Sequence, residues 1–210
     1  MKTKLVLMSV ASAVLLTTTA FAQIFSVHGS TAAPGSGLGP YTMTSFGADL
    51  RPDFSSVSSV DSPLGGSVLF SSPQQIRTVG SNWATWSHGY TGTVYYGGTT
   101  TLTLTLPTQT GAFYFYIEPN PFSDVSFTFT SGDHSFAEIV NGTGGAEYVG
   151  FYGLNGSTID SISISAETDF AVGEFAIASF GGAVPEPSTY GLLGAVALCG
   201  LVAYRRFRQR

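Results

Sequence analysis

The sequence predicts an all-β fold, an antiparallel β-sandwich of the jelly-roll kind, between an N-terminal signal peptide and a C-terminal transmembrane helix. From residue 91 onward, short segments alternate polar and apolar residues with the period of two that half-buried strands have. Turn-forming residues separate these segments, and the pattern of a long amphipathic helix does not interrupt them. Short strands at this spacing are typical of antiparallel sandwiches.

The clearest alternation lies in three segments of the second half. Residues 99–106 alternate Thr with Leu, and Pro107 ends that strand. Residues 112–117 and 125–130 place apolar side chains at every second position. The side chains expected to face the core are Leu102, Leu104, Leu106, Phe113, Phe115, Ile117, Val125, Phe127 and Phe129. Further strands are expected at residues 135–140, 147–152, 159–165 and 170–180.

Three short polar segments between these strands are typical of tight turns. They are Ser131-Gly132-Asp133, Asn141-Gly142 and Asn155-Gly156, and such turns need positive φ. Both Asn-Gly pairs also fit the N-glycosylation acceptor pattern, but we interpret them as turns.

The pattern of residues 23–75 is less regular. Residues 33–40 and 55–59 are rich in Gly, Pro and Ser and are expected to form loops and short edge structure. One or two strands are expected, near residues 41–46 and 67–71.

Residues 1–22 have the three parts of a secretory signal peptide. Lys2 and Lys4 precede an apolar stretch at residues 5–16, and Ala20-Phe21-Ala22 supplies the two small residues of a cleavage site. Cleavage is expected before Gln23. The alternative is an uncleaved N-terminal anchor, but the apolar stretch is short for a membrane-spanning segment.

The C-terminal residues predict a membrane anchor. Val184-Pro185-Glu186-Pro187-Ser188 is followed by an apolar run at residues 189–204. A helix of that length rises about 24 Å, which spans a bilayer core when flanking arginines extend to the interface. The basic end of this tail consists of Arg205, Arg206, Arg208 and Arg210. A basic cluster favours the cytoplasmic side, so the domain before the helix is expected on the other side of the inner membrane.

This order of Pro-Glu-Pro, short apolar helix and terminal arginines at residues 184–210 resembles the PEP-CTERM sorting signal of Gram-negative bacteria. The resemblance implies that Pro185, Glu186 and Pro187 form the sorting motif and that an exosortase, an integral-membrane enzyme, removes the tail. It also implies a cargo of the cell surface or of an exopolysaccharide or biofilm matrix. A generic anchor that follows two prolines is the alternative. Residues 83–180 resemble uncharacterised exported domains that often precede such tails, which implies an all-β fold and no known activity.

The exported region, residues 23–183, is strongly acidic. Six of the eight basic residues lie in the terminal segments, which leaves Arg51 and Arg77 against 12 acidic residues and a net charge of −10. Such a field disfavours nucleic acids and anionic membranes as partners. The one cysteine, Cys199, lies in the tail, so the exported region has no disulfide and needs a hydrophobic core.

Motifs of catalysis are missing from the sequence, and we expect no enzyme. His28, His88 and His134 lack metal-ligand spacing, and there is no G-x-S-x-G elbow. Asp133-His134-Ser135 has the residue types of a hydrolytic triad, but neighbours on a strand point to opposite faces. A glycoside hydrolase, which needs two carboxylates at a set separation, is a distant alternative.

No cofactor is expected, with Ca²⁺ as the one candidate metal. Loop carboxylates at Asp124, Asp133, Asp169 and Glu174 have the hard oxygen ligands that Ca²⁺ prefers. A contiguous calcium-loop motif is missing, and solvated surface acids are the alternative interpretation.

An aromatic cluster at Trp83, Trp86, His88 and Tyr90 is the candidate glycan-binding site. Sugar rings stack their C–H faces on Trp and Tyr, and polar neighbours complete the hydrogen bonds. The alternative is that both tryptophans cover the open end of the core. Two hypotheses therefore stand, a non-enzymatic envelope or matrix protein and a lectin-like module that binds exopolysaccharide.

Overall fold

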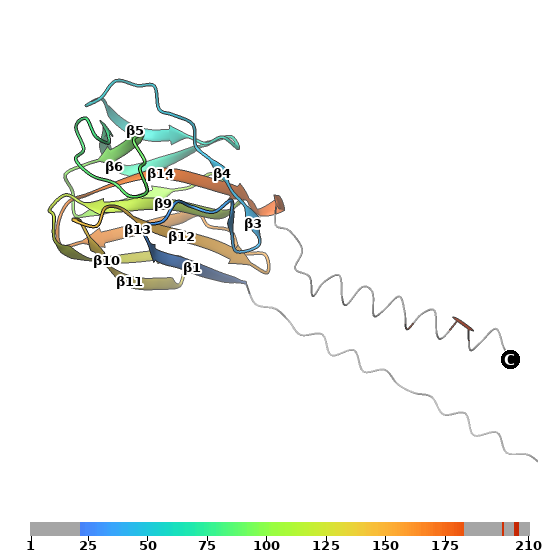
Figure 1. The fold of residues 1–210 in the computed structure, drawn as a ribbon. Coiled ribbons are helices and arrows are strands. Elements are labelled where there is room, and N and C mark those ends of the chain that lie inside the picture. The colour runs from blue at the N-terminus through green and yellow to red at the C-terminus, as the bar shows by residue number, and fades with distance from the viewer. Residues whose placement is uncertain (1–21, 183–198, 200–203, 206–210) are drawn as a thin grey trace, which may run out of the picture.

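The computed structural model describes residues 22–182 together with Cys199, Tyr204 and Arg205 (Figure 1). The predicted signal peptide lies outside the described residues except for Ala22, which is exposed just before the first strand. The sorting motif and most of the expected helix at residues 189–204 also lie outside them. Within the described part, no helix has the length and hydrophobicity needed to cross a bilayer.

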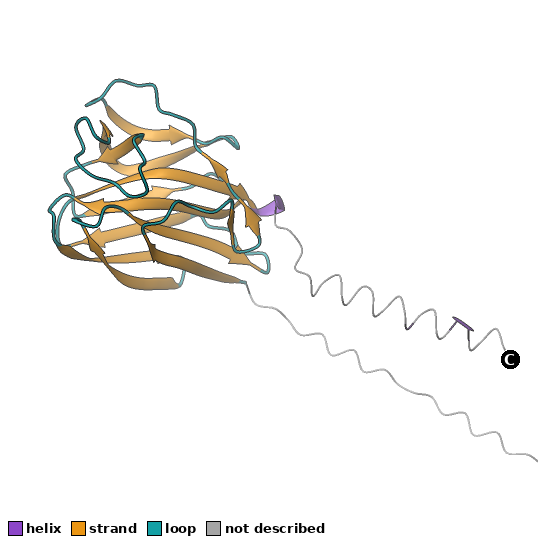
Figure 2. Ribbon diagram, in the orientation of Figure 1, coloured by secondary structure: helices purple, strands orange, loops and turns teal. Residues whose placement is uncertain are grey.

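The domain is all-β and antiparallel, as predicted, and most of its strands belong to one sheet (Figure 2). Along the hydrogen-bonded path the order is β1 (Gln23–Ser30), β12 (Glu147–Leu154), β9 (Thr110–Pro119), β14 (Phe170–Ser179), β7 (Thr93–Tyr96), β6 (Ser67–Thr78), β8 (Thr101–Thr105), β13 (Ser161–Ala166), β10 (Asp124–Ser131) and β11 (His134–Asn141). Beside this path, β4 (Thr44–Ser45) pairs with β14 and β5 (Ser56–Asp61) pairs with β6. A small hairpin, β2 (Gly37–Leu38) and β3 (Tyr41–Thr42), and a 3-10 turn, η1 (Phe180–Gly182), complete the domain.

The long strand β6 connects the two halves of this sheet. Its first part pairs with β8 through Leu69 and Phe70, and its last residues, 75–78, pair with β7. The sheet therefore turns a corner within one strand, and its halves face each other across the core. The jelly-roll prediction is corrected here, because the described hydrogen bonds run through a single folded sheet instead of two separate ones.

The two ends of the sheet, β1 and β11, meet without a described backbone ladder. They lie side by side along one edge of the domain (Figure 1). His28 Nδ1 lies 2.6 Å from Glu138 Oε2, and Ser26 Oγ lies 2.9 Å from His134 Nε2. Side chains thus bridge the gap, and the sheet is nearly closed.

Strand β9 lies at the centre of the packing because both of its faces are buried. Phe113, Phe115 and Ile117 enter the main core, and the inward side chains predicted on the other strands join them there. On the opposite face, Tyr114 and Tyr116 are covered by the residues before β5, and the Tyr116 hydroxyl donates to the carbonyl of Ala32. The sequence predicted the first face and not the burial of the second.

The first part of the chain is more regular than predicted. It contributes six strands, β1 to β6, where one or two were expected, and β7 was also missed. In β5 the buried residues Val57 and Val60 are three apart, because a register shift follows Val57. This irregularity removes the period of two that identifies a strand in sequence.

All three predicted turns are confirmed, two of them with the expected positive φ. Gly132 has φ 54°, and Asn155 and Gly156 have φ 54° and 94°. The expectation of positive φ at Asn141-Gly142 is wrong. Instead, Asn141 Oδ1 accepts the backbone N–H groups of Thr143 and Gly144, at 2.9 and 2.8 Å.

Candidate functional site

The aromatic cluster lies on the loop between β6 and β7, and two carboxylates of the sheet, one buried and one half-buried, hold that loop. Glu118 comes from the end of β9 and Glu174 from the middle of β14, two strands that pair with each other. Each carboxylate accepts a hydrogen bond from one tryptophan of the loop. The loop is therefore fixed to the sheet at two points.

Trp83 is pinned by Glu118. Its indole N–H donates to one oxygen of Glu118, and the Thr85 hydroxyl donates to the other at 2.6 Å. Glu118 is 1% exposed, and this burial raises the pKa of its carboxyl group although both hydrogen bonds lower it. Trp83 is 8% exposed and its ring packs against Tyr96, with centroids 5.4 Å apart. This is the position expected if Trp83 covers the core.

Glu174 holds the next part of the loop. Its Oε1 lies 2.8 Å from His88 Nε2, and its Oε2 accepts the Trp86 indole N–H at 3.2 Å. Glu174 sits at a register shift between Gly173 and Ala176, where the strand bulges. Both His88 and Glu174 have left-handed backbones, with φ 40° and 55°. Strain of this kind persists only where the surroundings impose it, and it concentrates at functional sites.

Ser87, His88 and Glu174 form a chain of hydrogen bonds with the residue types of a hydrolase. Ser87 Oγ lies 3.1 Å from His88 Nδ1, which also lies 3.3 Å from the carbonyl oxygen of Thr31. Ser87, however, is 4% exposed and lines neither of the cavities described below. The arrangement joins the loop to the segment after β1 and does not present a nucleophile to solvent.

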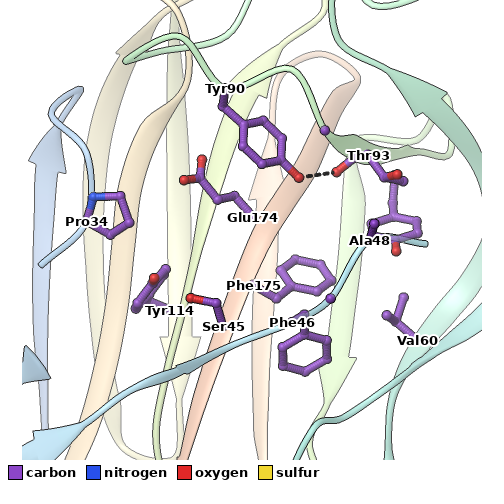
Figure 3. A pocket seen from close by; sticks show the side chains of 13 residues that line it. Pro34, Ser45, Phe46, Ala48, Val60, Tyr90, Thr93, Tyr114, Glu174 and Phe175 are labelled. Atoms are coloured by element: carbon purple, nitrogen blue, oxygen red, sulfur yellow. Dashed lines mark hydrogen bonds between the residues drawn. The ribbon is translucent and has the colours of Figure 1, made fainter. Parts of the chain in front are cut away.

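The larger cavity beside this loop has a volume of about 370 Å³ (Figure 3). Glu174 and Tyr90 stand at one end, and Phe46, Phe175 and Val60 form an apolar part. Burial, with the charge of Glu174 as a second cause, raises the pKa of Tyr90 to about 12. With that pKa the Tyr90 hydroxyl is protonated at neutral pH, and it donates to the carbonyl oxygen of Thr93 at 3.0 Å. The polar groups at this end are engaged with the protein itself.

A second cavity, of about 260 Å³, lies on the Trp83 side of the loop. It is lined by Arg77, Asn82, Trp83, Ala84, Thr85, Tyr96, Glu118, Pro119, Asn120 and Phe122. The sequence analysis assigned no role to Arg77, Asn120 or Phe122. The prolines on either side of Asn120 mark a loop, but no pattern in the sequence places that loop opposite Arg77.

The structure therefore divides the predicted glycan-binding cluster. Trp83 borders the second cavity, Tyr90 borders the first, and Trp86 and His88 lie between them as anchors to Glu174. The four side chains do not line one common surface groove.

A comparison with protein families identifies the motif in the C-terminal segment. The model of the PEP-CTERM protein-sorting motif matches residues 183–208. The chain carries a PEP-CTERM sorting motif. The resemblance noted in the sequence is thus confirmed, and it implies an exported protein of a Gram-negative bacterium that an exosortase processes. No curated protein is significantly similar to the chain.

The PEP-CTERM match includes Pro185, Glu186, Pro187, Arg206 and Arg208, all of which lie outside the described residues. Arg205 is described and is exposed in a helical segment, and Arg210 lies beyond the match. Of the predicted cleavage-site residues, Ala20 lies outside the described part and Ala22 within it.

The calcium candidates of this PEP-CTERM protein occupy separate places. Asp124 and Asp133 lie at opposite ends of the β10–β11 hairpin, and Asp124 accepts the Asn141 amide at 2.5 Å. Asp169 accepts hydrogen bonds from Tyr96 and Asn120, and Glu174 holds the loop between β6 and β7. Within residues 22–182, no three His, Cys, Asp or Glu side chains are arranged to hold a metal ion.

Proposed function

We propose that this chain is a non-enzymatic protein of the bacterial envelope or extracellular matrix, delivered to its place by the PEP-CTERM signal. The match at residues 183–208 carries the proposal. The signal peptide predicted at residues 1–22 supports entry into the Sec route, and the arginines after residue 204 support an inner-membrane anchor with the domain outside. Exosortase then separates the domain from its anchor.

The non-enzymatic part rests on how two carboxylates of β9 and β14 are used by the loop between β6 and β7. Glu118 accepts two hydrogen bonds from the loop, and Glu174 accepts two more. Because these groups hold a loop in place, a reacting substrate would have to displace structural contacts. We therefore expect the domain to act through its location and its surface contacts, without catalysis.

A second candidate function is binding of exopolysaccharide by the domain. The observation that favours it is a pair of solvent-exposed phenylalanines, Phe54 and Phe122, beside the second cavity. Exposed rings next to convergent polar groups are the usual components of a sugar-binding surface.

Mass spectrometry of the mature C-terminus tests sorting. In wild-type cells the C-terminal peptide should end before the arginine cluster, and in Glu186→Ala cells it should extend to Arg210. Glu167→Ala, a change of an exposed acidic residue in the domain, is the matched control and should be processed like the wild type. An intact Arg210 terminus in wild-type cells, or unchanged processing of Glu186→Ala, would contradict the proposal.

A further inference from the structure

Phe54 and Phe122 stand out among the aromatic side chains of residues 22–182. Every other Phe, Tyr and Trp in that range is buried or half-buried, whereas Phe54 is 56% and Phe122 61% exposed. Phe54 also has φ 65°, a backbone conformation that bulky residues rarely adopt. An exposed ring held in a costly conformation points to a use for the ring.

Arg77 connects these two rings to the second cavity. Its guanidinium carbon lies 4.4 Å from the Phe54 ring centroid and 5.6 Å from that of Tyr96, and it lines the cavity together with Phe122. In the described part of the chain Arg77 pairs with no carboxylate, whereas Arg51 pairs with Asp49 at 2.6 Å. Stacking thus holds Arg77 as a fixed group beside an aromatic surface.

The hydrogen-bonding groups around the cavity are of mixed kind and are held in place. Arg77 Nη2 donates to Gln75 Oε1 at 2.8 Å, and the guanidinium group has further N–H donors for a ligand. Asn120 donates to Asp169 Oδ2 at 3.1 Å, and no described residue donates to its side-chain oxygen. The Thr85 hydroxyl oxygen can still accept a bond while it donates to Glu118.

The charges at this cavity disfavour an anionic ligand. Glu118 lines it, and Asp169 lies at its rim through bonds to Tyr96 and Asn120. These two acids outnumber Arg77, and the surrounding domain carries a net charge of −10. A group that both donates and accepts hydrogen bonds without charge, such as a sugar hydroxyl, fits these partners best.

We propose that this cavity, with Phe122 as its stacking platform and Arg77 and Asn120 as its polar contacts, binds a neutral sugar unit of a polysaccharide. This deepens the second candidate function above and rests on it. The site differs from the cluster that the sequence suggested, because Trp83 lines it but Trp86 and His88 do not. Phe54 extends the surface beyond Arg77, toward a neighbouring unit of the same chain.

Affinity electrophoresis of the full-length protein in detergent tests the site. Native gels would contain dextran, laminarin, galactomannan or arabinoxylan as neutral probes, and polygalacturonate as the acidic probe. At least one neutral polysaccharide should retard the wild type, and polygalacturonate should not. Phe122→Ala and Asn120→Ala should weaken the retardation about tenfold each, whereas Phe122→Tyr, which keeps a ring, should retain it.

Ile139→Ala is the matched control, because Ile139 is as exposed as Phe122 but lies on β11. It should migrate like the wild type. Unretarded migration in all four neutral gels, retardation by polygalacturonate alone, or retardation that Phe122→Ala leaves unchanged would each overturn the proposal. The sorting proposal is tested separately, by mass spectrometry of the mature C-terminus. If that proposal fails, the electrophoresis result still reports on sugar binding.

Discussion

His88 and Glu174 come from segments 86 residues apart in sequence and meet through a 2.8 Å hydrogen bond, each with a left-handed backbone. Left-handed φ costs a side-chain-bearing residue about 1–2 kcal/mol, so the contacts on both sides must offset that cost. The pair fixes the aromatic loop to β14, and through Thr31 it also reaches the segment after β1.

Glu174→Ala should lower the free energy of unfolding by about 2–3 kcal/mol, because His88 and Trp86 lose their acceptor and the backbone strain remains. Glu174→Gly should be less destabilising by about 1 kcal/mol, since glycine adopts φ 55° without penalty. Urea unfolding of the full-length protein measures both. Glu167→Ala serves as the exposed control, and equal effects of Glu167→Ala and Glu174→Ala would contradict the anchoring role.

Tyr96→Phe should destabilise the protein mainly above pH 4. The Tyr96 hydroxyl holds the pKa of Asp169 below its ordinary value of 3.8. A depressed carboxyl pKa stabilises the fold at pH above 3.8, and this contribution is lost as the pH falls through the folded-state pKa. The expected loss at neutral pH is about 0.5–1.5 kcal/mol.

The difference between wild type and Tyr96→Phe should therefore shrink in unfolding measurements between pH 6 and pH 3. Tyr90→Phe removes a hydroxyl that donates to a carbonyl, so its effect should not change over this range. A wild-type advantage over Tyr96→Phe that grows toward pH 3 would show that Asp169 is not the responsible partner.

Glu118→Gln should change the pH dependence in the opposite sense. Burial raises the pKa of Glu118 above its ordinary value of 4.5, so the folded state holds its proton more tightly than the unfolded state. The wild type then loses stability, relative to Glu118→Gln, as the pH rises from about 4.5 through the folded-state pKa. Unfolding free energies from pH 4 to 8 measure this, with Glu167→Gln as the exposed control; a relative gain with rising pH would refute it.

Gly142→Ala should be strongly destabilising for a steric reason. A Cβ at this position would lie 2.3 Å from the carbonyl oxygen of Pro121, so the loop that carries Asn120 and Phe122 would have to move. We expect a loss of about 2–4 kcal/mol. Gly156→Ala, at φ 94° but in open space, should cost about 1 kcal/mol, and Gly35→Ala close to zero. Thermal unfolding that ranks the three in another order would contradict this assignment.

Period-two patterns such as that of residues 101–105 were enough to predict strands and the face that each one buries. They failed in β5, where a bulge separates Val57 from Val60. The turn at Asn141-Gly142 forms without the positive φ expected from the Asn-Gly pair, and the close approach of Pro121 explains its glycine. Both departures from expectation arise because the deciding contact comes from a distant segment.

The candidate site was predicted only in part. The sequence identified Trp83 and Trp86 as important but left open which way their indoles point, which depends on Glu118 and Glu174 from the sheet below. Phe122 resembles any core phenylalanine in sequence, and only the folded chain shows its ring in solvent beside Arg77. The tail was predictable because its motif is contiguous.

The pairing of β1 with β12 also bears on how the domain crosses a membrane. Gln23 pairs with Leu154 and Ser45 with Ala176, partners about 130 residues apart. A polypeptide emerging from a translocation pore with its N-terminus first cannot form either ladder until the later partner has come through. The sheet is therefore complete only when nearly all of the domain is outside, because its long-range ladders form last.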